Sequence, residues 1–176
     1  MHANVRITAL LLALGLGSAL GADAAAQSNP ACTLLTDEEL SAAAGRPYGK
    51  GTPGDNLGEG IGGGASCQWG GADFMPGEDP PMVAIVFIPA SARGSYTETQ
   101  LSRKPARPCT RETLRGIGDA AFLELCERDR GPAIYARTGR NDIVVVVDPE
   151  EGKPLASARP RAIAIAKAVA PKARGQ

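Results

Sequence analysis

The stretch Met82–Ile88, which reads Met-Val-Ala-Ile-Val-Phe-Ile, decides the fold because every residue in it is apolar. A run of this length is short for a helix, and its β-branched residues favour extended backbone. Strands that are buried on both faces have this continuous apolar pattern. We therefore predict a central strand here, covered on both sides of its sheet.

Shorter apolar segments on either side of this run predict its neighbours in the sheet. The predicted strands are Cys67–Trp69 before it and Ala120–Cys126, Pro132–Arg137 and Asp142–Asp148 after it. The links at 128–131 and 138–141 have the length and the turn residues of hairpins. Consecutive strands joined by hairpins are antiparallel, so we expect a mainly antiparallel sheet.

The first helix has start and stop signals in the sequence. Thr36 followed by Glu39 is a capping box, which satisfies backbone N–H groups at a helix start. Gly45 is a residue type that ends helices in the left-handed conformation. These signals predict a helix over Asp37–Ala44.

Two further helices are predicted from capping residues and apolar periodicity. Ser95 and Glu98 have capping-box spacing and predict a helix near Tyr96–Lys104. The alanine-rich segment Ala158–Ala170 has apolar residues on one helical face. Pro171 is expected to end that last helix.

The predicted order is therefore α-β-β-α-β-β-β-α. It indicates an α+β fold with about five strands in a mainly antiparallel sheet and with helices packed on one face. The glycine-rich stretch 46–66 is expected to form a long loop. Residues 27–176 have the length of one ordinary domain with a single hydrophobic core. We expect them to form a single disulfide-bonded α+β domain.

Residues 1–26 have the three zones of a secretory signal peptide. Met1–Arg6 carries positive charge, Ile7–Gly21 is apolar, and Ala22–Ala26 offers small residues for cleavage. The apolar zone is shorter than the ~20 residues that a membrane-spanning helix needs. We expect cleavage before Gln27, a periplasmic or secreted protein, and no transmembrane segment in the mature chain.

Four cysteines remain after the leader: Cys32, Cys67, Cys109 and Cys126. An even number of cysteines in an exported chain predicts disulfides, and the absence of a Cys-x-x-Cys pair argues against a zinc or redox site. Three pairings are open. We favour the sequential pairing, because it ties the lead into the first helix to the Cys67–Trp69 strand and closes Cys109 onto the end of the third predicted strand.

The charges are balanced, with 19 basic and 19 acidic residues in the chain. Nucleic-acid binding depends on neutralising phosphates, so a balanced chain argues against a nucleic-acid partner. Residues 153–176 nevertheless hold six bases and no acid. Weak contact of this basic C-terminal helix with an anionic membrane surface is one interpretation. A solvated face that pairs with the acidic N-terminal part is the interpretation we favour.

Histidine is missing from the mature chain, because His2 lies in the leader. This excludes Ser-His-Asp and Cys-His catalysis and the zinc sites that use histidine. Residues 58–63 match a dinucleotide-binding glycine pattern, but neither a preceding strand nor a following helix is predicted. We therefore expect no catalytic residue, no metal ligand and no cofactor.

These exclusions favour an exported, non-enzymatic binding or interaction domain for an unknown small ligand or envelope protein. The sheet surface left uncovered by helices, beside the loop 46–66, is the expected binding surface. Two alternatives stay open. One is a carboxylate-based hydrolase of envelope polymers, and the other is an envelope accessory or inhibitor protein that binds another protein.

Several short motifs carry a resemblance to a known family. They are Cys32-x-Leu34-Leu35-Thr36-x-x-Glu39-Leu40, Ser66-Cys67-x-Trp69 and Gly116-Ile117-Gly118-Asp119-Ala120-Ala121. With these motifs the chain resembles small exported actinobacterial proteins, mostly lipoproteins, of unknown function. It is similar, more distantly, to extracellular sensor domains of mycobacterial receptor kinases.

The resemblance implies an α+β domain with a disulfide between Cys32 and Cys67, and it implies no catalytic residues. The chain departs from the family in two respects. No leucine stands three residues before Cys32, as a lipid-attachment site requires, and Cys109 and Cys126 are an additional pair.

Overall fold

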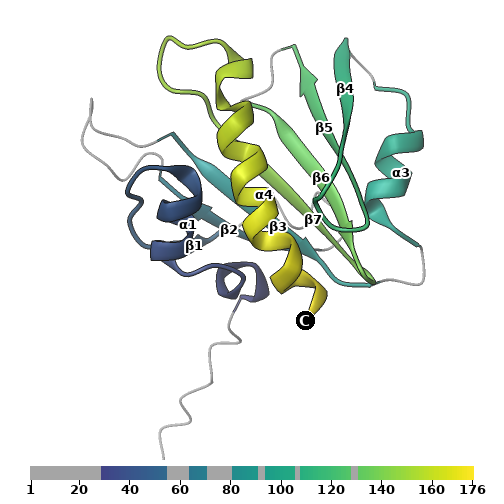
Figure 1. The fold of residues 1–176 in the computed structure, drawn as a ribbon, viewed down its shortest axis with the longest axis horizontal. Coiled ribbons are helices and arrows are strands. Elements are labelled where there is room, and N and C mark those ends of the chain that lie inside the picture. The colour runs from purple at the N-terminus through teal and green to yellow at the C-terminus, as the bar shows by residue number, and fades with distance from the viewer. Residues whose placement is uncertain (1–28, 55–63, 71–80, 91–93, 106–107, 128–130) are drawn as a thin grey trace, which may run out of the picture.

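The computed structural model describes residues 29–54, 64–70, 81–90, 94–105, 108–127 and 131–176 (Figure 1). The predicted leader and the glycine pattern at 58–63 lie outside the described residues. The helices are α1 (Asp37–Ala44), α3 (Tyr96–Ser102) and α4 (Arg159–Arg174), with short 3-10 helices η1 (Pro30–Thr33) and η2 (Leu155–Ala158). The strands are β1 (Thr52–Pro53), β2 (Ala65–Trp69), β3 (Val83–Ile88), β4 (Cys109–Leu114), β5 (Ala120–Cys126), β6 (Ala133–Thr138) and β7 (Asn141–Val147).

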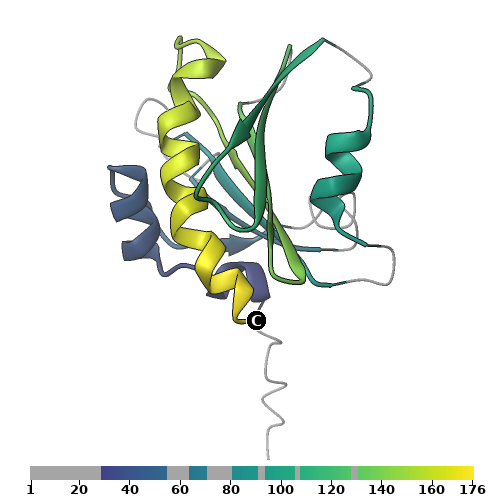
Figure 2. The same cartoon turned by 45° about the vertical axis from the view of Figure 1, so that its right-hand side comes forward.

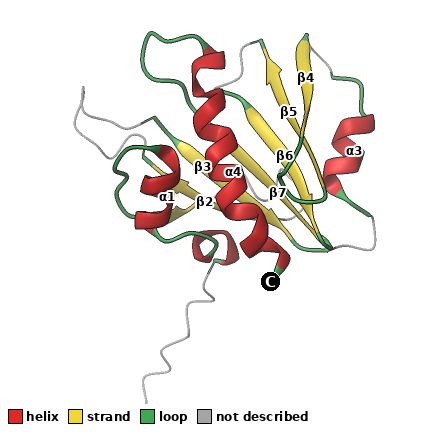
Figure 3. Ribbon diagram, viewed as in Figure 1, coloured by secondary structure: helices red, strands yellow, loops and turns green. Residues whose placement is uncertain are grey.

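The strands form one sheet in the order β1-β2-β3-β7-β6-β5-β4, and every neighbouring pair is antiparallel (Figure 3). The predicted α+β class and the antiparallel sheet are thus confirmed. The predicted strand number and element order are wrong in detail, because the sheet formed by the described residues has seven strands. The two additional strands, β1 and β4, are its edges, and neither has an apolar face that would mark it in the sequence.

The apolar run at 82–88 is the central strand that its sequence predicts. It forms β3, which lies between β2 and β7, and all six residues of the strand are buried. Ile85 is paired with Cys67 on one side and with Val145 on the other. Helices on both faces of the sheet explain why no residue of β3 is polar.

Helices cover both faces of the sheet, so the expectation of helices on one face is wrong. α4 lies across one face with α1 beside it, and α3 lies on the opposite face (Figures 1 and 2). The chain leaves the middle of the sheet after β3 and must reach the far edge to begin β4. α3 makes this crossing and covers a small apolar cluster of three buried residues, Val86, Ile88 and Val144.

The helix signals in the sequence are accurate at α1 and inaccurate at α4. At α1 the Thr36–Glu39 capping box is present, and Gly45 has a φ of 70°. α4 continues through Pro171, which was expected to end it. The last turn is held in place because Ala173 is fully buried and its carbonyl oxygen accepts a hydrogen bond of 2.8 Å from Asn141 Nδ2.

Two disulfides join the cysteines in the sequential pairing. Cys32–Cys67 links η1 to β2 in the main core, and Cys109–Cys126 links residues directly opposite each other on β4 and β5. Two disulfides indicate a non-reducing environment of the kind found outside the cytoplasm. The side chain of Trp69 is buried in the same core as Cys67.

The basic residues of α4 are mostly paired with carboxylates. Of its five lysines and arginines, four form ion pairs, and Lys172 pairs with Glu39 of the acidic N-terminal part. No helix in the described part of the chain is long and apolar enough to cross a membrane.

Candidate functional site

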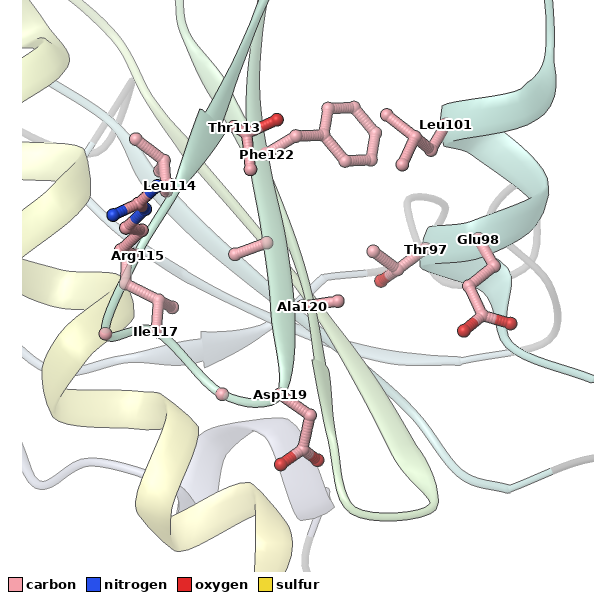
Figure 4. A pocket seen from close by; sticks show the side chains of 13 residues that line it. Thr97, Glu98, Leu101, Thr113, Leu114, Arg115, Ile117, Asp119, Ala120 and Phe122 are labelled. Atoms are coloured by element: carbon pink, nitrogen blue, oxygen red, sulfur yellow. The ribbon is translucent and has the colours of Figure 1, made fainter.

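A cavity of about 410 Å³ lies between α3 and the hairpin formed by β4 and β5 (Figure 4). One wall is the face of α3 that carries Thr97, Glu98 and Leu101, and the other is the hairpin segment 113–122. Ligand cavities in proteins commonly have volumes of about 300–1,000 Å³. The cavity is therefore large enough for a small molecule or for one large side chain of a partner.

The start of α3 is held against the sheet by Asp142 on β7. The Asp142 carboxylate accepts hydrogen bonds from Ser95 Oγ at 2.8 Å, from the Tyr96 N–H at 2.9 Å and from the Thr97 N–H at 3.1 Å. The two N–H groups are backbone donors that the first turn of a helix leaves unpaired. Asp142 is buried, so these bonds fix the wall of the cavity that α3 provides.

The end of α3 is held by Arg111 on β4. The Arg111 side chain pairs with Glu124, and its Nη1 donates to the carbonyl oxygens of Leu101 and Arg103 at 3.0 and 2.8 Å. Its guanidinium also lies 5.5 Å from the centre of the Phe122 ring. Both ends of α3 are therefore bonded to the sheet, and the space between helix and hairpin is preformed.

The lining between these two ends is apolar. The side chain of Leu101 points from α3 toward the hairpin, and the Phe122 ring points back toward it (Figure 4). Phe122 stacks on Tyr135 of β6 with ring centroids 4.8 Å apart, which fixes its orientation. Leu101 is 50 % exposed, so this wall of the cavity includes accessible apolar surface.

Thr97 brings one polar group to this apolar lining. Its side chain points from α3 toward β5, and the residue is only 2 % exposed (Figure 4). Among the described residues its hydroxyl has no hydrogen-bond partner. A buried polar atom without a partner is costly, and most such atoms in proteins are bonded. The hydroxyl is thus a buried polar group in the wall of the cavity whose hydrogen-bonding capacity no described residue uses.

Two carboxylates line the same cavity, and both point away from the space between Thr97 and Phe122 (Figure 4). Glu98 forms an ion pair with Arg137, and Asp119 forms one with Arg174. The Gly139 N–H, which donates to Asp119 Oδ2, and the Arg174 guanidinium lower the pKa of Asp119. Asp119 is therefore an ionised structural carboxylate in the turn after β4. The Gly139 donor lies in the β6–β7 turn, so this carboxylate also joins the two turns.

The turn between β4 and β5 requires glycine at position 118. Gly118 has a φ of 58°, a conformation that favours glycine. A Cβ atom there would collide with the Arg137 carbonyl oxygen of the neighbouring hairpin. The turn therefore lies close against β6, and the buried side chain of Ile117 attaches it to the core.

A second cavity, of about 340 Å³, lies near the opposite end of the same hairpin, beside Cys109 and Cys126. The sulfur atoms of these cysteines and a Glu124 carboxylate oxygen lie within 4.8 Å of one another. Metal ions bind thiolates, and both sulfur atoms are committed to the disulfide. This cluster therefore offers a metal only the Glu124 carboxylate, which is already paired with Arg111.

The sequence predicts a binding surface on the sheet face without helices, and part of that face is covered in the structure. α3 covers part of the second face of the sheet, and residues 55–63 of the neighbouring loop lie outside the described residues. The sequence did not identify Thr97, Leu101 and Phe122 as site residues. A helix over 96–104 places Thr97 and Leu101 on one face, but only the three-dimensional structure brings Phe122 opposite them.

No protein-family model, curated protein or solved structure matches this chain.

Proposed function

We propose that this protein is an exported, non-enzymatic binding domain whose ligand occupies the cavity between α3 and the β4–β5 hairpin. The observation that carries the proposal is the Thr97 hydroxyl, which is buried, faces the cavity and has no partner among the described residues. A hydroxyl both donates and accepts hydrogen bonds. A ligand with one polar atom would therefore satisfy it.

The rest of the lining supports an amphipathic ligand. Leu101 and Phe122 offer apolar contact, and ligand sites generally combine an apolar lining with a few polar groups. Because α3 is bonded to the sheet by Asp142 and Arg111, binding would order few additional groups. A preformed site of this kind loses little affinity to conformational entropy.

The alternative of a carboxylate-based hydrolase has less support. Such an enzyme needs one carboxyl group with a raised pKa to act as general acid. At the cavity, hydrogen bonding lowers the pKa of Asp119, and its side chain points away from the space a substrate would fill. Glu98 also points away and is paired with Arg137.

The proposal is tested with a pair of matched threonine variants. A thermal-shift screen with amphipathic metabolites, acyl chains and envelope glycans identifies compounds that raise the melting temperature, and calorimetry gives their affinity. Thr97→Val keeps the side-chain volume and removes the hydroxyl, so we expect affinity to fall about fivefold, as one neutral hydrogen bond is worth ~1 kcal/mol.

Thr138→Val is the matched control. Thr138 is fully buried and its hydroxyl also has no partner among the described residues, but it does not line the cavity. We expect ligand affinity to be unchanged in this variant. A screen without any hit, or equal effects of the two substitutions, would contradict the proposed site.

A further inference from the structure

The outer edge of β4, next to the cavity, pairs with no other strand among the described residues. β4 is the last strand of the sheet and is six residues long. The opposite edge, β1, has only two residues, and one of them is Pro53. Short strands and proline are devices that stop a sheet edge from pairing with another chain. β4 is longer and contains no proline, so its backbone can pair with an added strand more readily than that of β1.

The pairing register shows which backbone groups of β4 point outward. Cys109 and Cys126 are opposite each other with Cα atoms 4.0 Å apart, the short spacing of a non-hydrogen-bonded pair. The preceding pair is hydrogen-bonded, since the Glu127 N–H donates to the Pro108 carbonyl oxygen at 3.2 Å. Because hydrogen-bonded and non-hydrogen-bonded pairs alternate along the two strands, Arg111 and Thr113 are in non-hydrogen-bonded pairs. Their backbone N–H and C=O groups therefore point away from β5. Among the described residues, no backbone group bonds to them.

We propose that β4 binds an extended acidic segment of a partner protein, which adds to the sheet as a further strand. The inference rests on the proposed function, because one side chain of that segment would occupy the cavity. The side chains of Arg111 and Thr113 lie on the face of the sheet that α3 covers, opposite Glu124 and Phe122. Alternate side chains of an added strand would point to the same face, where Leu101 and Phe122 line the cavity.

The charge around β4 favours an acidic partner. Residues 103–115 contain five basic residues and one acid, Glu112, in a chain with no net charge. Glu112 is paired with Arg159, and Arg111 is paired with Glu124. The three other basic residues that the structure describes in this segment, Arg103, Lys104 and Arg115, are exposed and form no ion pair with described residues. Uncompensated positive charge would attract a negatively charged segment and speed its association.

Backbone chemistry favours a polypeptide over other anions. The outward edge presents N–H donors and C=O acceptors in alternation, and an extended peptide matches both. A phosphate group or an anionic lipid headgroup is an acceptor at these positions and leaves the carbonyl oxygens unmatched. The partner that uses the whole edge is therefore an extended chain with acidic side chains.

The test uses an array of peptides of about eight residues, long enough to span β4. Valine, isoleucine or threonine alternates with aspartate or glutamate, and a matched array has lysine in place of the acids. Binding is measured by fluorescence anisotropy at low ionic strength. We expect acidic peptides to bind at least about tenfold more tightly than their lysine counterparts. Binding that is absent or equal in the two arrays would overturn the proposal.

N-methylation of the best acidic peptide then tests strand addition directly. Methyl groups on the alternate amides that face β4 remove donors and clash with the edge, whereas methyl groups on the other amides point outward. We expect one alternate set to abolish binding and the other to leave it within about twofold. Equal effects of the two sets would show that the peptide does not bind as a strand.

A protein variant provides the complementary measurement. Thr113→Pro removes one outward N–H at a position where an edge strand tolerates proline, and Thr113→Ala is its matched control. We expect peptide binding to be about fivefold weaker in the proline variant than in the alanine variant, because both lose the threonine side chain and only the proline variant loses the N–H. If Thr113→Pro does not fold, slower hydrogen exchange of the Arg111 and Thr113 amides on peptide binding to the unaltered protein supports the inference, and unchanged exchange refutes it.

Failure of this inference is distinguishable from failure of the cavity proposal. If small amphipathic compounds bind, Thr97→Val weakens their binding and no peptide binds, then the cavity is a ligand site and the proposal of strand addition is wrong. A second outcome would overturn the inference. In that outcome anionic vesicles or single-stranded DNA bind, Arg115→Glu weakens their binding, and acidic peptides do not compete with them. The edge would then recognise phosphate and not a polypeptide.

Discussion

Replacing Arg111 with alanine is the most informative perturbation of the site, because this one side chain holds α3 to the β4–β5 hairpin. Arg111 bonds to Glu124 and to two carbonyl oxygens at the end of α3. Hydrogen bonds to charged groups contribute about 1.5–3 kcal/mol when buried. The side chains of Arg111 and Glu124 are 21 % and 14 % exposed, so solvent screening reduces the stabilising free energy of these bonds.

We expect Arg111→Ala to lower the free energy of unfolding by about 2–3 kcal/mol, measured by urea denaturation. Hydrogen exchange should also be faster at the α3 amides, because the end of the helix is released. Arg111→Lys keeps the charge but not the planar donor pattern, and should recover only part of the loss.

Arg159→Ala is the matched control on the other face of the same hairpin. Arg159 pairs with Glu112, and their side chains are 42 % and 51 % exposed. Exposed ion pairs contribute little, so we expect a loss of about 0.5 kcal/mol or less. Equal losses in Arg111→Ala and Arg159→Ala, or unchanged exchange in α3, would refute the conclusion that Arg111 preforms the cavity.

Three further predictions concern the turn, the pH dependence and the first disulfide. Gly118→Ala should destabilise the protein by clearly more than the ~1 kcal/mol expected of Gly116→Ala, because both positions have positive φ but only position 118 lacks space for a Cβ atom; urea denaturation of both variants checks this. The lowered pKa of Asp119 means that its stabilising effect is present above the ordinary aspartate pKa and is lost as the pH falls through the depressed value, so thermal unfolding between pH 5 and pH 2 should depend less on pH in Asp119→Asn. Replacing Cys32 and Cys67 together by alanine should cost about 4 kcal/mol on the chain-entropy model, since the bridge closes a separation of 35 residues; a loss below ~1 kcal/mol would contradict that model here.

The sequence is most informative where a single element contains its own signals. The capping box at Thr36 and Glu39, followed by Gly45, places the ends of α1 where the structure has them. The apolar run at 82–88 predicts the central strand for the same reason, because burial on both faces excludes polar residues from it. Short-range signals of this kind depend on neighbours within a few residues, which the sequence shows directly.

The elements that the sequence missed depend on distant parts of the chain. β4 reads Cys-Thr-Arg-Glu-Thr-Leu and has no apolar face, because an edge strand exposes much of its surface. The position of α3 on the second face follows from the connection between β3 and β4, which local patterns do not contain. The predicted bridge between Cys109 and Cys126 was the available clue, since it places residue 109 beside the end of β5.

The candidate site was unpredictable for the same reason. Thr97 is an ordinary polar residue in the sequence, and its hydroxyl matters only because Asp142 and Arg111 hold α3 over Phe122. The continuation of α4 through Pro171 likewise depends on a distant residue, Asn141, which bonds to the last turn. Tertiary contacts override local rules at both places.

An NMR titration of the isotope-labelled protein with the tightest ligand from the thermal-shift screen or the peptide array tests the central claim most directly. The account predicts that chemical-shift changes concentrate at Thr97, Leu101 and the hairpin 113–122, which line the cavity. For a bound peptide, the amides of Arg111 and Thr113 should also become protected from exchange. Changes centred on α4 or on β1 instead, with the cavity residues unaffected, would contradict it.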